Sequence, residues 1–157
     1  VVFITEHSEN GSVGFILNKS SHIPLNIFVS QMNSDLIVYE GGPVDKDNIY
    51  YLHSRPDLIS DSEKITENIY WSGNYDDVKE AINNGKIADN EIRFYLGYSG
   101  WTAQQLENEL SMNAWIHIRE KIDIFREWEV DLWKKQLIKL GGENLLWVNA
   151  PADPSMN

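Results

Sequence analysis

Short apolar runs separated by polar turns dominate the first half of the chain, and this pattern predicts strands joined by reversals. Two runs rich in β-branched residues, 1–5 and 13–17, flank Glu9-Asn10-Gly11. An Asn-Gly pair in this position is typical of a tight hairpin turn. We therefore predict a hairpin at the start of the chain, followed by strands at 36–39, 49–53, 65–71, 92–96 and 114–118.

Helical spacing of apolar residues appears in four other segments, which are 24–32, 75–84, 103–111 and 127–140. The second has Asn74 as a candidate N-cap and Asn84-Gly85 as a stop, and Thr102 with Gln105 has the spacing of a capping box before the third. The last helix carries an apolar heptad stripe, but Trp128 lies off it. That residue suggests either a partner-binding side or a face that covers the sheet.

The order of these elements favours an α+β fold. Hairpin signals and short strands argue against regular βαβ winding, so we expect a mixed, mainly antiparallel sheet with helices outside it. The sequence contains no internal repeat and no low-complexity linker, and residues 1–157 therefore read as a single domain.

Composition and charge exclude several classes of function. Hydrophobic residues make up 42% and charged residues 24%, as in ordinary folded domains. The net charge of −11 would repel phosphate backbones and anionic lipids, so direct nucleic-acid or membrane binding is not expected. The absence of cysteine excludes disulfides, thiolate zinc sites and a cysteine nucleophile. No apolar run approaches the roughly 20 residues that span a bilayer, and a cytoplasmic location is expected.

One segment, Gly97-Tyr98-Ser99-Gly100-Trp101, half resembles the G-x-S-x-G nucleophile elbow at an expected strand-to-helix turn. Trp101 stands where the elbow has its second glycine. A serine nucleophile also needs a base and an oxyanion hole, and no spacing in the chain selects them. The other interpretation is a tight turn in which the glycines provide backbone freedom and Trp101 anchors the next helix.

The histidines and the glycine-rich turns suggest no metal and no cofactor. His7, His22, His53 and His117 lack metal-ligand spacing, and Glu6 and His7 are adjacent, so on a strand they would face opposite ways. Gly41-Gly42-Pro43 lacks the pattern of a phosphate-binding loop. A turn where two backbones approach closely is the better interpretation of that segment.

Three blocks of sequence, taken together, resemble one bacterial family. They are residues 1–7 with 11–19, then 41–44 with the strand up to 53, and finally 96–101 with 105–115. Their order and spacing are similar to those of AlgH-like proteins, also called YqgE-type, whose function is unknown and whose members are often labelled transcriptional regulators. The resemblance implies a small, partly closed β-barrel with surrounding helices, and a segment before the first strand that this chain lacks. Ser20 replaces a usual proline, and members often carry alanine in place of Ser99.

These observations favour a non-enzymatic regulatory or scaffold domain that binds a protein partner or a small ligand. Loops with special backbone needs suggest the functional surface, which comprises Glu6, His7, Asn18, Lys19, Gly41, Gly42, Pro43, His53, Gly97, Tyr98, Ser99 and Trp101. The alternative is a hydrolase that uses Ser99 or a His/carboxylate pair. Transcriptional regulation is the second alternative, although no helix-turn-helix pattern is present and the charge disfavours DNA contact.

Overall fold

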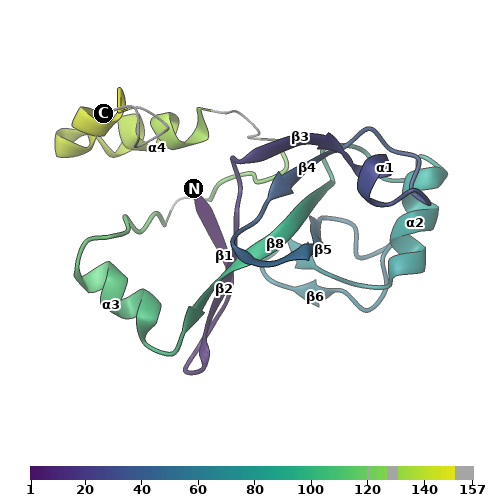
Figure 1. Cartoon of the computed structure of the whole chain (residues 1–157), viewed down its shortest axis with the longest axis horizontal. Coiled ribbons are helices and arrows are strands. Elements are labelled where there is room, and N and C mark those ends of the chain that lie inside the picture. The colour runs from purple at the N-terminus through teal and green to yellow at the C-terminus, as the bar shows by residue number, and fades with distance from the viewer. Residues whose placement is uncertain (120, 127–130, 151–157) are drawn as a thin grey trace.

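Eight strands form one curled, mainly antiparallel sheet in the computed structural model, which describes residues 1–119, 121–126 and 131–150 (Figure 1). The sheet has the strand order β1-β2-β8-β5-β7-β6, and β4 joins β8 in parallel and β3 in antiparallel fashion. The strands are β1 (Val2–Ser8), β2 (Gly11–Ile16), β3 (Ser20–Pro24), β4 (Ile37–Glu40), β5 (Val44–His53), β6 (Glu63–Lys64), β7 (Tyr70–Trp71) and β8 (Ile92–Thr102). The predicted α+β class and mixed sheet are confirmed.

Helices lie at both ends of this sheet in Figure 1. They are α1 (Leu25–Phe28), α2 (Tyr75–Asn83), α3 (Gln105–Ser111), α4 (Leu132–Leu140) and the 3-10 helix η1 (Gly142–Trp147). The side chain of Asn74 accepts hydrogen bonds from the backbone N–H groups of Asp76 and Asp77, which confirms the predicted N-cap of α2. Figure 1 shows α4 and η1 apart from the strands, with the N-terminus between them and β2.

Strand β8 separates two apolar cores because its successive side chains point to opposite faces. Ile92 and Phe94 contribute to the core that lies under α2, while Tyr95 lies in the other core with Phe15 and Leu52. All five side chains are almost fully buried. The second core also contains residues that follow α3, so the C-terminal part of the chain packs on the β1 side of the sheet.

The predicted turn at 97–101 is wrong, because β8 continues through this segment. Gly97 takes φ +62 and bends the strand without ending it. Beyond this bend β8 pairs with both neighbours: Tyr98 lies opposite Val44 of β5, and Ser99 lies opposite Gly14 of β2. Hydrogen bonds to the strands on both sides therefore keep residues 97–101 extended, although their glycines alone suggested a turn.

Three other predicted boundaries also shift. The strand expected at 65–71 is the small β6–β7 hairpin, whose turn is closed by the hydrogen bond from Ile65 N–H to Ile69 C=O, 2.9 Å. The helix expected at 24–32 is shortened to α1, since Val29 already has an extended backbone. Helix α3 begins only at Gln105, after Gln104 in the left-handed region. The predicted capping box is therefore wrong, because Thr102 ends β8 and Gln104 is the N-cap, although Thr102 N–H still donates to Gln105 Oε1 at 3.0 Å.

No strand forms at 114–118, although apolar residues alternate there. The segment is largely exposed and has no pairing partner among the described residues, so alternation alone does not make it part of the sheet. The helix expected at 127–140 is observed as α4, and its first four residues, including Trp128, lie outside the described residues.

Candidate functional site

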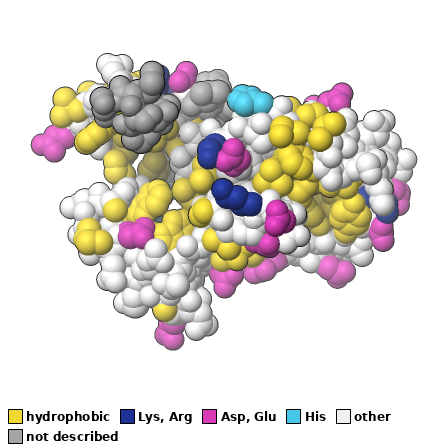
Figure 2. Space-filling view, in the orientation of Figure 1, with side chains coloured by type: hydrophobic (Ala, Val, Ile, Leu, Met, Phe, Trp, Pro, Cys, Tyr) yellow, Lys and Arg dark blue, Asp and Glu magenta, His cyan; other side chains and the backbone are white. Residues whose placement is uncertain are grey.

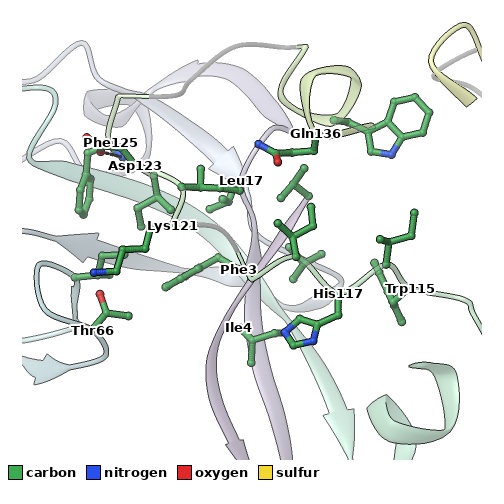
Figure 3. A pocket seen from close by; sticks show the side chains of 18 of the residues that line it. Phe3, Ile4, Leu17, Thr66, Trp115, His117, Lys121, Asp123, Phe125 and Gln136 are labelled. Atoms are coloured by element: carbon green, nitrogen blue, oxygen red, sulfur yellow. Dashed lines mark hydrogen bonds between the residues drawn. The ribbon is translucent and has the colours of Figure 1, made fainter. Parts of the chain in front are cut away.

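A large groove lies between β1, the connection 114–126 and α4, and its volume is about 1330 Å³ (Figure 3). Figure 2 shows hydrophobic side chains gathered around the hollow between α3 and α4. The walls are mainly apolar and include Phe3, Ile4, Leu106, Trp115, Phe125 and Leu137. Concave, mainly apolar walls are typical of a binding site.

Strand β1 forms one wall of the groove and is the edge strand of the sheet. Among the described strands it pairs only with β2, in antiparallel register from Val2 opposite Ile16 to Ser8 opposite Gly11. Its first three residues, Val2, Phe3 and Ile4, are apolar and only partly buried.

A carboxylate clamp holds the opposite wall in place. Glu109 Oε2 accepts hydrogen bonds from the indole N–H of Trp101, 3.0 Å, and of Trp115, 2.6 Å. Its Oε1 accepts from Gln105 Nε2 at 2.9 Å. The two indole rings meet edge to face at 5.9 Å. Hydrogen bonds from Trp115, Gln105 and Trp101 lower the pKa of Glu109, because they stabilise its ionised form.

Helix α4 closes the third side with Trp133, Leu137 and Leu140. Its buried Leu132 belongs to the same apolar core as Ile124 and Phe125. Gln136 also lines the groove and is only 3% exposed (Figure 3). Its side-chain Nε2 has no hydrogen-bond partner among the described residues. A buried amide donor without an acceptor is unfavourable.

His7 lies at the rim of the groove and belongs to a short polar chain. Its Nδ1 is 2.8 Å from Ser12 Oγ, and its Nε2 is 3.6 Å from Glu107 Oε1. These residue types resemble a nucleophile, a base and an acid. Ser12, however, is only 4% exposed and does not line the groove, so a substrate in the groove would not meet its hydroxyl.

The structure brings Gly41, Gly42, Gly97 and Ser99 of the predicted surface together as a backbone crossing. A Cβ added to Gly42 would lie 2.2 Å from the carbonyl of Tyr98, and one added to Gly41 would lie 2.2 Å from the carbonyl oxygen of Gly97. Ser99 is buried, and its hydroxyl donates to the carbonyl of Gly41 at 3.1 Å. The hydroxyl of Ser99 is therefore bonded to a backbone carbonyl, whereas the hydroxyl of a serine nucleophile would be bonded to a histidine.

His53 is fully buried and holds two backbone groups. Its Nδ1 accepts from Arg55 N–H at 3.1 Å, so the proton is on Nε2, which donates to the carbonyl of Ser72 at 3.1 Å. Burial lowers the pKa of His53 because it disfavours the charged imidazole. Tyr70 stacks on the same ring, with 5.8 Å between centroids.

The other predicted site residues lie elsewhere. Asn18 accepts a hydrogen bond from the N-terminal amine of Val1, 2.8 Å, and Lys19 forms an ion pair with Glu40. The ring of Tyr98 packs edge to face on Tyr50. Glu6 and Pro43 are exposed. Within the predicted surface, only His7 and Trp101 line the groove.

Most groove residues were absent from the predicted surface, because nothing local in the sequence marks Phe3, Ile4, Leu106 or Gln136. The available signal was the alternation of apolar residues in 114–118, a run that has no strand partner in the part of the chain that the structure describes. Across the described part of the chain, no group of three His, Asp or Glu side chains could hold a metal ion. None of the described helices is long and apolar enough to cross a membrane.

Comparison with known proteins gives a consistent family assignment. Similar proteins include a UPF0301 protein of Chlorobium chlorochromatii, 40% identical over all of this chain and 85% of the relative, and one of Parabacteroides distasonis, 36% identical over all of this chain and 81% of the relative. The solution structure of the AlgH protein from Pseudomonas aeruginosa matches with a TM-score of 0.73 and 26% identity, over 97% of this chain and 84% of that one.

A crystal structure of a Corynebacterium diphtheriae protein shares the fold, with a TM-score of 0.73 at 18% identity, covering 94% of this chain and 81% of that one. The AlgH-like family model matches residues 1–145. The sequence blocks, the half-barrel sheet and these matches agree, and the chain belongs to the AlgH-like family.

Proposed function

We propose that this protein is a non-enzymatic regulatory or scaffold domain that binds a protein partner or a small ligand in the groove beside β1. The observation that carries the proposal is the groove itself, an apolar space of about 1330 Å³ between an edge strand and a helix. Aromatic side chains such as Trp115 and Phe125 line it, and aromatic residues supply much of the binding energy at protein interfaces.

The surroundings of Ser99 and Ser12 favour a binding role for this protein over a catalytic one. Ser99 donates its hydroxyl to a backbone carbonyl, and Ser12 lies beneath His7 outside the groove. A nucleophile must reach both a base and a substrate space. We therefore expect a fluorophosphonate probe, which labels activated serines, to leave the protein unmodified. Stoichiometric labelling of either serine would support the hydrolase alternative.

Charge supports a protein or neutral ligand over nucleic acid. The net charge of −11 produces a field that repels phosphate groups. A cytoplasmic location is part of the proposal, because a chain without cysteine suits a reducing compartment. Regulation of transcription, if this protein takes part in it, would then proceed through a protein partner.

A pair of matched variants tests the groove. Ile116 lines it and is 51% exposed, whereas Ile138 lies on α4 outside the lining and is 57% exposed. Because both side chains are already solvated, Ile116→Asp and Ile138→Asp should leave the fold intact. Proteins or ligands captured by the wild-type protein, identified by mass spectrometry, should be lost with Ile116→Asp and kept with Ile138→Asp. Equal capture by both variants would refute the groove as the functional site.

A further inference from the structure

We infer that the protein forms a symmetric dimer through the outer face of its C-terminal arm, which comprises α4 and η1, residues 132–147. The partner that covers this face is a second copy of the chain. The face is separate from the groove, so its role goes beyond the proposed function and does not depend on it. Three properties of the arm support a second copy as the partner: its exposure, its apolar area and its charge.

Helix α4 turns one side toward the groove and another toward solvent. Trp133, Leu137 and Leu140 line the groove and have the spacing of neighbours on one helix face. Ile138 does not line the groove, because the helix turns by about 100° from one residue to the next. The side chain of Ile138 is 57% exposed. An apolar side chain therefore faces solvent on the side of α4 away from the groove.

Helix η1 adds further exposed apolar side chains to the arm. Leu145, Leu146 and Trp147 are 49%, 80% and 61% exposed, and no residue of η1 is buried. Figure 1 shows α4 and η1 apart from the sheet, and Figure 2 shows hydrophobic side chains on the surface of this part of the molecule. The described part of the chain thus leaves these side chains largely uncovered.

The exposed apolar area is of the size that a weak specific dimer needs. Taking about 200 Å² for a bare side chain of this kind, the exposed fractions of these four side chains correspond to about 500 Å² in one copy. A symmetric pair would bury about 1,000 Å², which is near the lower limit for a specific interface. We therefore expect a reversible dimer with a dissociation constant in the micromolar range or weaker.

Charge favours the arm as the place where two copies meet. With its N-cap Asp131, the arm carries three lysines against two acidic residues, a net charge of +1, which leaves −12 for the rest of a chain of −11. Two copies of such an acidic chain repel each other when their other surfaces approach. The arm also exposes both Lys139 and Glu143. A two-fold axis brings the same patch of both copies together, so opposite charges of the two arms can meet.

A dimer of this kind would give the protein two grooves in one particle, because α4 forms a groove wall with one side and would join the copies with the other. Two linked sites bind an oligomeric or repeated partner more tightly than a single site does. This consequence alone rests on the proposed function.

Analytical ultracentrifugation of the wild-type protein between about 10 and about 500 μM tests the dimer. The average mass should rise with concentration toward twice that of the chain. Because both copies are acidic, raising NaCl from about 20 to about 300 mM should screen their repulsion and tighten the dimer at least about 3-fold. A contact made mainly by ion pairs would weaken instead. A monomer at every concentration, or a dimer that salt weakens, would overturn the inference.

Leu146→Asp and Ile27→Asp form a matched pair of variants. The two side chains are 80% exposed on η1 and 70% exposed on α1, so both variants should fold, which circular dichroism checks. Each adds one negative charge, so the general repulsion between copies rises equally. Leu146→Asp should weaken the dimer at least about 10-fold, and Ile27→Asp less than about 2-fold, because only the first places a charge in the interface. Equal weakening by both, or loss with Ile27→Asp alone, would place the contact elsewhere.

Amide chemical shifts locate the contact without any substitution. The signals of 138 and 145–147 should move as the protein concentration rises, whereas those of α2, 75–83, should stay constant. Concentration-dependent shifts in α2 with none in the arm would contradict an interface at the arm.

Two further variants separate the dimer from the proposed function. Ile138→Asp should break the dimer and keep the ligands that the groove captures, whereas Ile116→Asp should keep the dimer and lose them. Loss of the dimer with Ile116→Asp would mean that the arm of one copy enters the groove of the other, which overturns contact between arms. A monomeric wild type that captures another protein through Leu146 would overturn it as well. An intact dimer without any captured ligand would count against the proposed function alone.

Discussion

Replacement of Gly42 by alanine should destabilise the protein strongly, because Gly42 passes directly against the backbone of β8. An added Cβ would lie 2.2 Å from both the carbonyl carbon and the oxygen of Tyr98 and 2.3 Å from the nitrogen of Ser99. Ordinary contact needs about 3.5 Å, so the two segments would have to separate by about 1 Å. None of these three atoms belongs to a flexible side chain that could move aside.

The expected loss of stability comes from the contacts that would be disrupted if the two segments moved apart. Overpacking alone costs about 1 to 3 kcal/mol. The hydrogen bonds from Gly41 N–H to Leu96 C=O, 2.8 Å, and from Ser99 Oγ to Gly41 C=O, 3.1 Å, hold the same crossing. Weakening both adds about 1 kcal/mol each. We expect a loss of about 3 to 5 kcal/mol, a large part of the roughly 5 to 15 kcal/mol that stabilise a domain.

Urea unfolding followed by circular dichroism measures this loss, and Gly100→Ala is the matched control. Gly100 lies on β8, the strand that Gly42 contacts, but the nearest atom to its added Cβ is the ring edge of Tyr98 at 3.3 Å, which can rotate away. That variant should stay within about 1 kcal/mol of the wild type. Comparable losses for the two variants, or a loss below about 1 kcal/mol for Gly42→Ala, would refute the assignment of Gly42 to a structural crossing.

Three further outcomes follow from single contacts. Burial lowers the pKa of His53, so the unfolded chain binds more protons than the folded one, and the urea midpoint should fall as the pH drops below about 6.5. The variant His53→Gln should flatten this dependence when urea unfolding is measured between about pH 7.5 and 5.5. Glu109→Leu should release the indole of Trp115, seen as a red shift of tryptophan emission, whereas an unchanged spectrum would contradict the clamp. Asn74→Ala should cost about 1 kcal/mol through loss of the α2 cap, and an unchanged urea midpoint would contradict this role.

Local signals predicted the elements whose partners are close in sequence. The Asn-Gly reversal marked the β1–β2 hairpin, and Asn74 with the apolar spacing of 75–84 marked α2 within one residue at its end. Both depend on turn and cap chemistry that acts over a few residues. The mixed, mainly antiparallel sheet was likewise predicted from hairpin signals, and the family from three spaced blocks. The single domain over 1–157 stays a prediction.

Errors arose where distant segments decide the conformation. Residues 97–101 look like a turn because of their glycines, but β2 and β5 supply partners on both edges and keep them extended. Residues 114–118 look like a strand, but no described segment offers them a ladder. Strand formation requires a partner, and the partner is not encoded within the strand.

The sequence alone determined the charge, the absence of thiol chemistry, the class of fold and the family. Only the tertiary structure decided that Gly41, Gly42 and Ser99 belong to a backbone crossing, and that an apolar groove opens beside β1. A groove is assembled from residues more than 100 positions apart, such as Phe3 and Gln136. Its existence depends on how elements pack across space, which local patterns of polar and apolar residues do not specify.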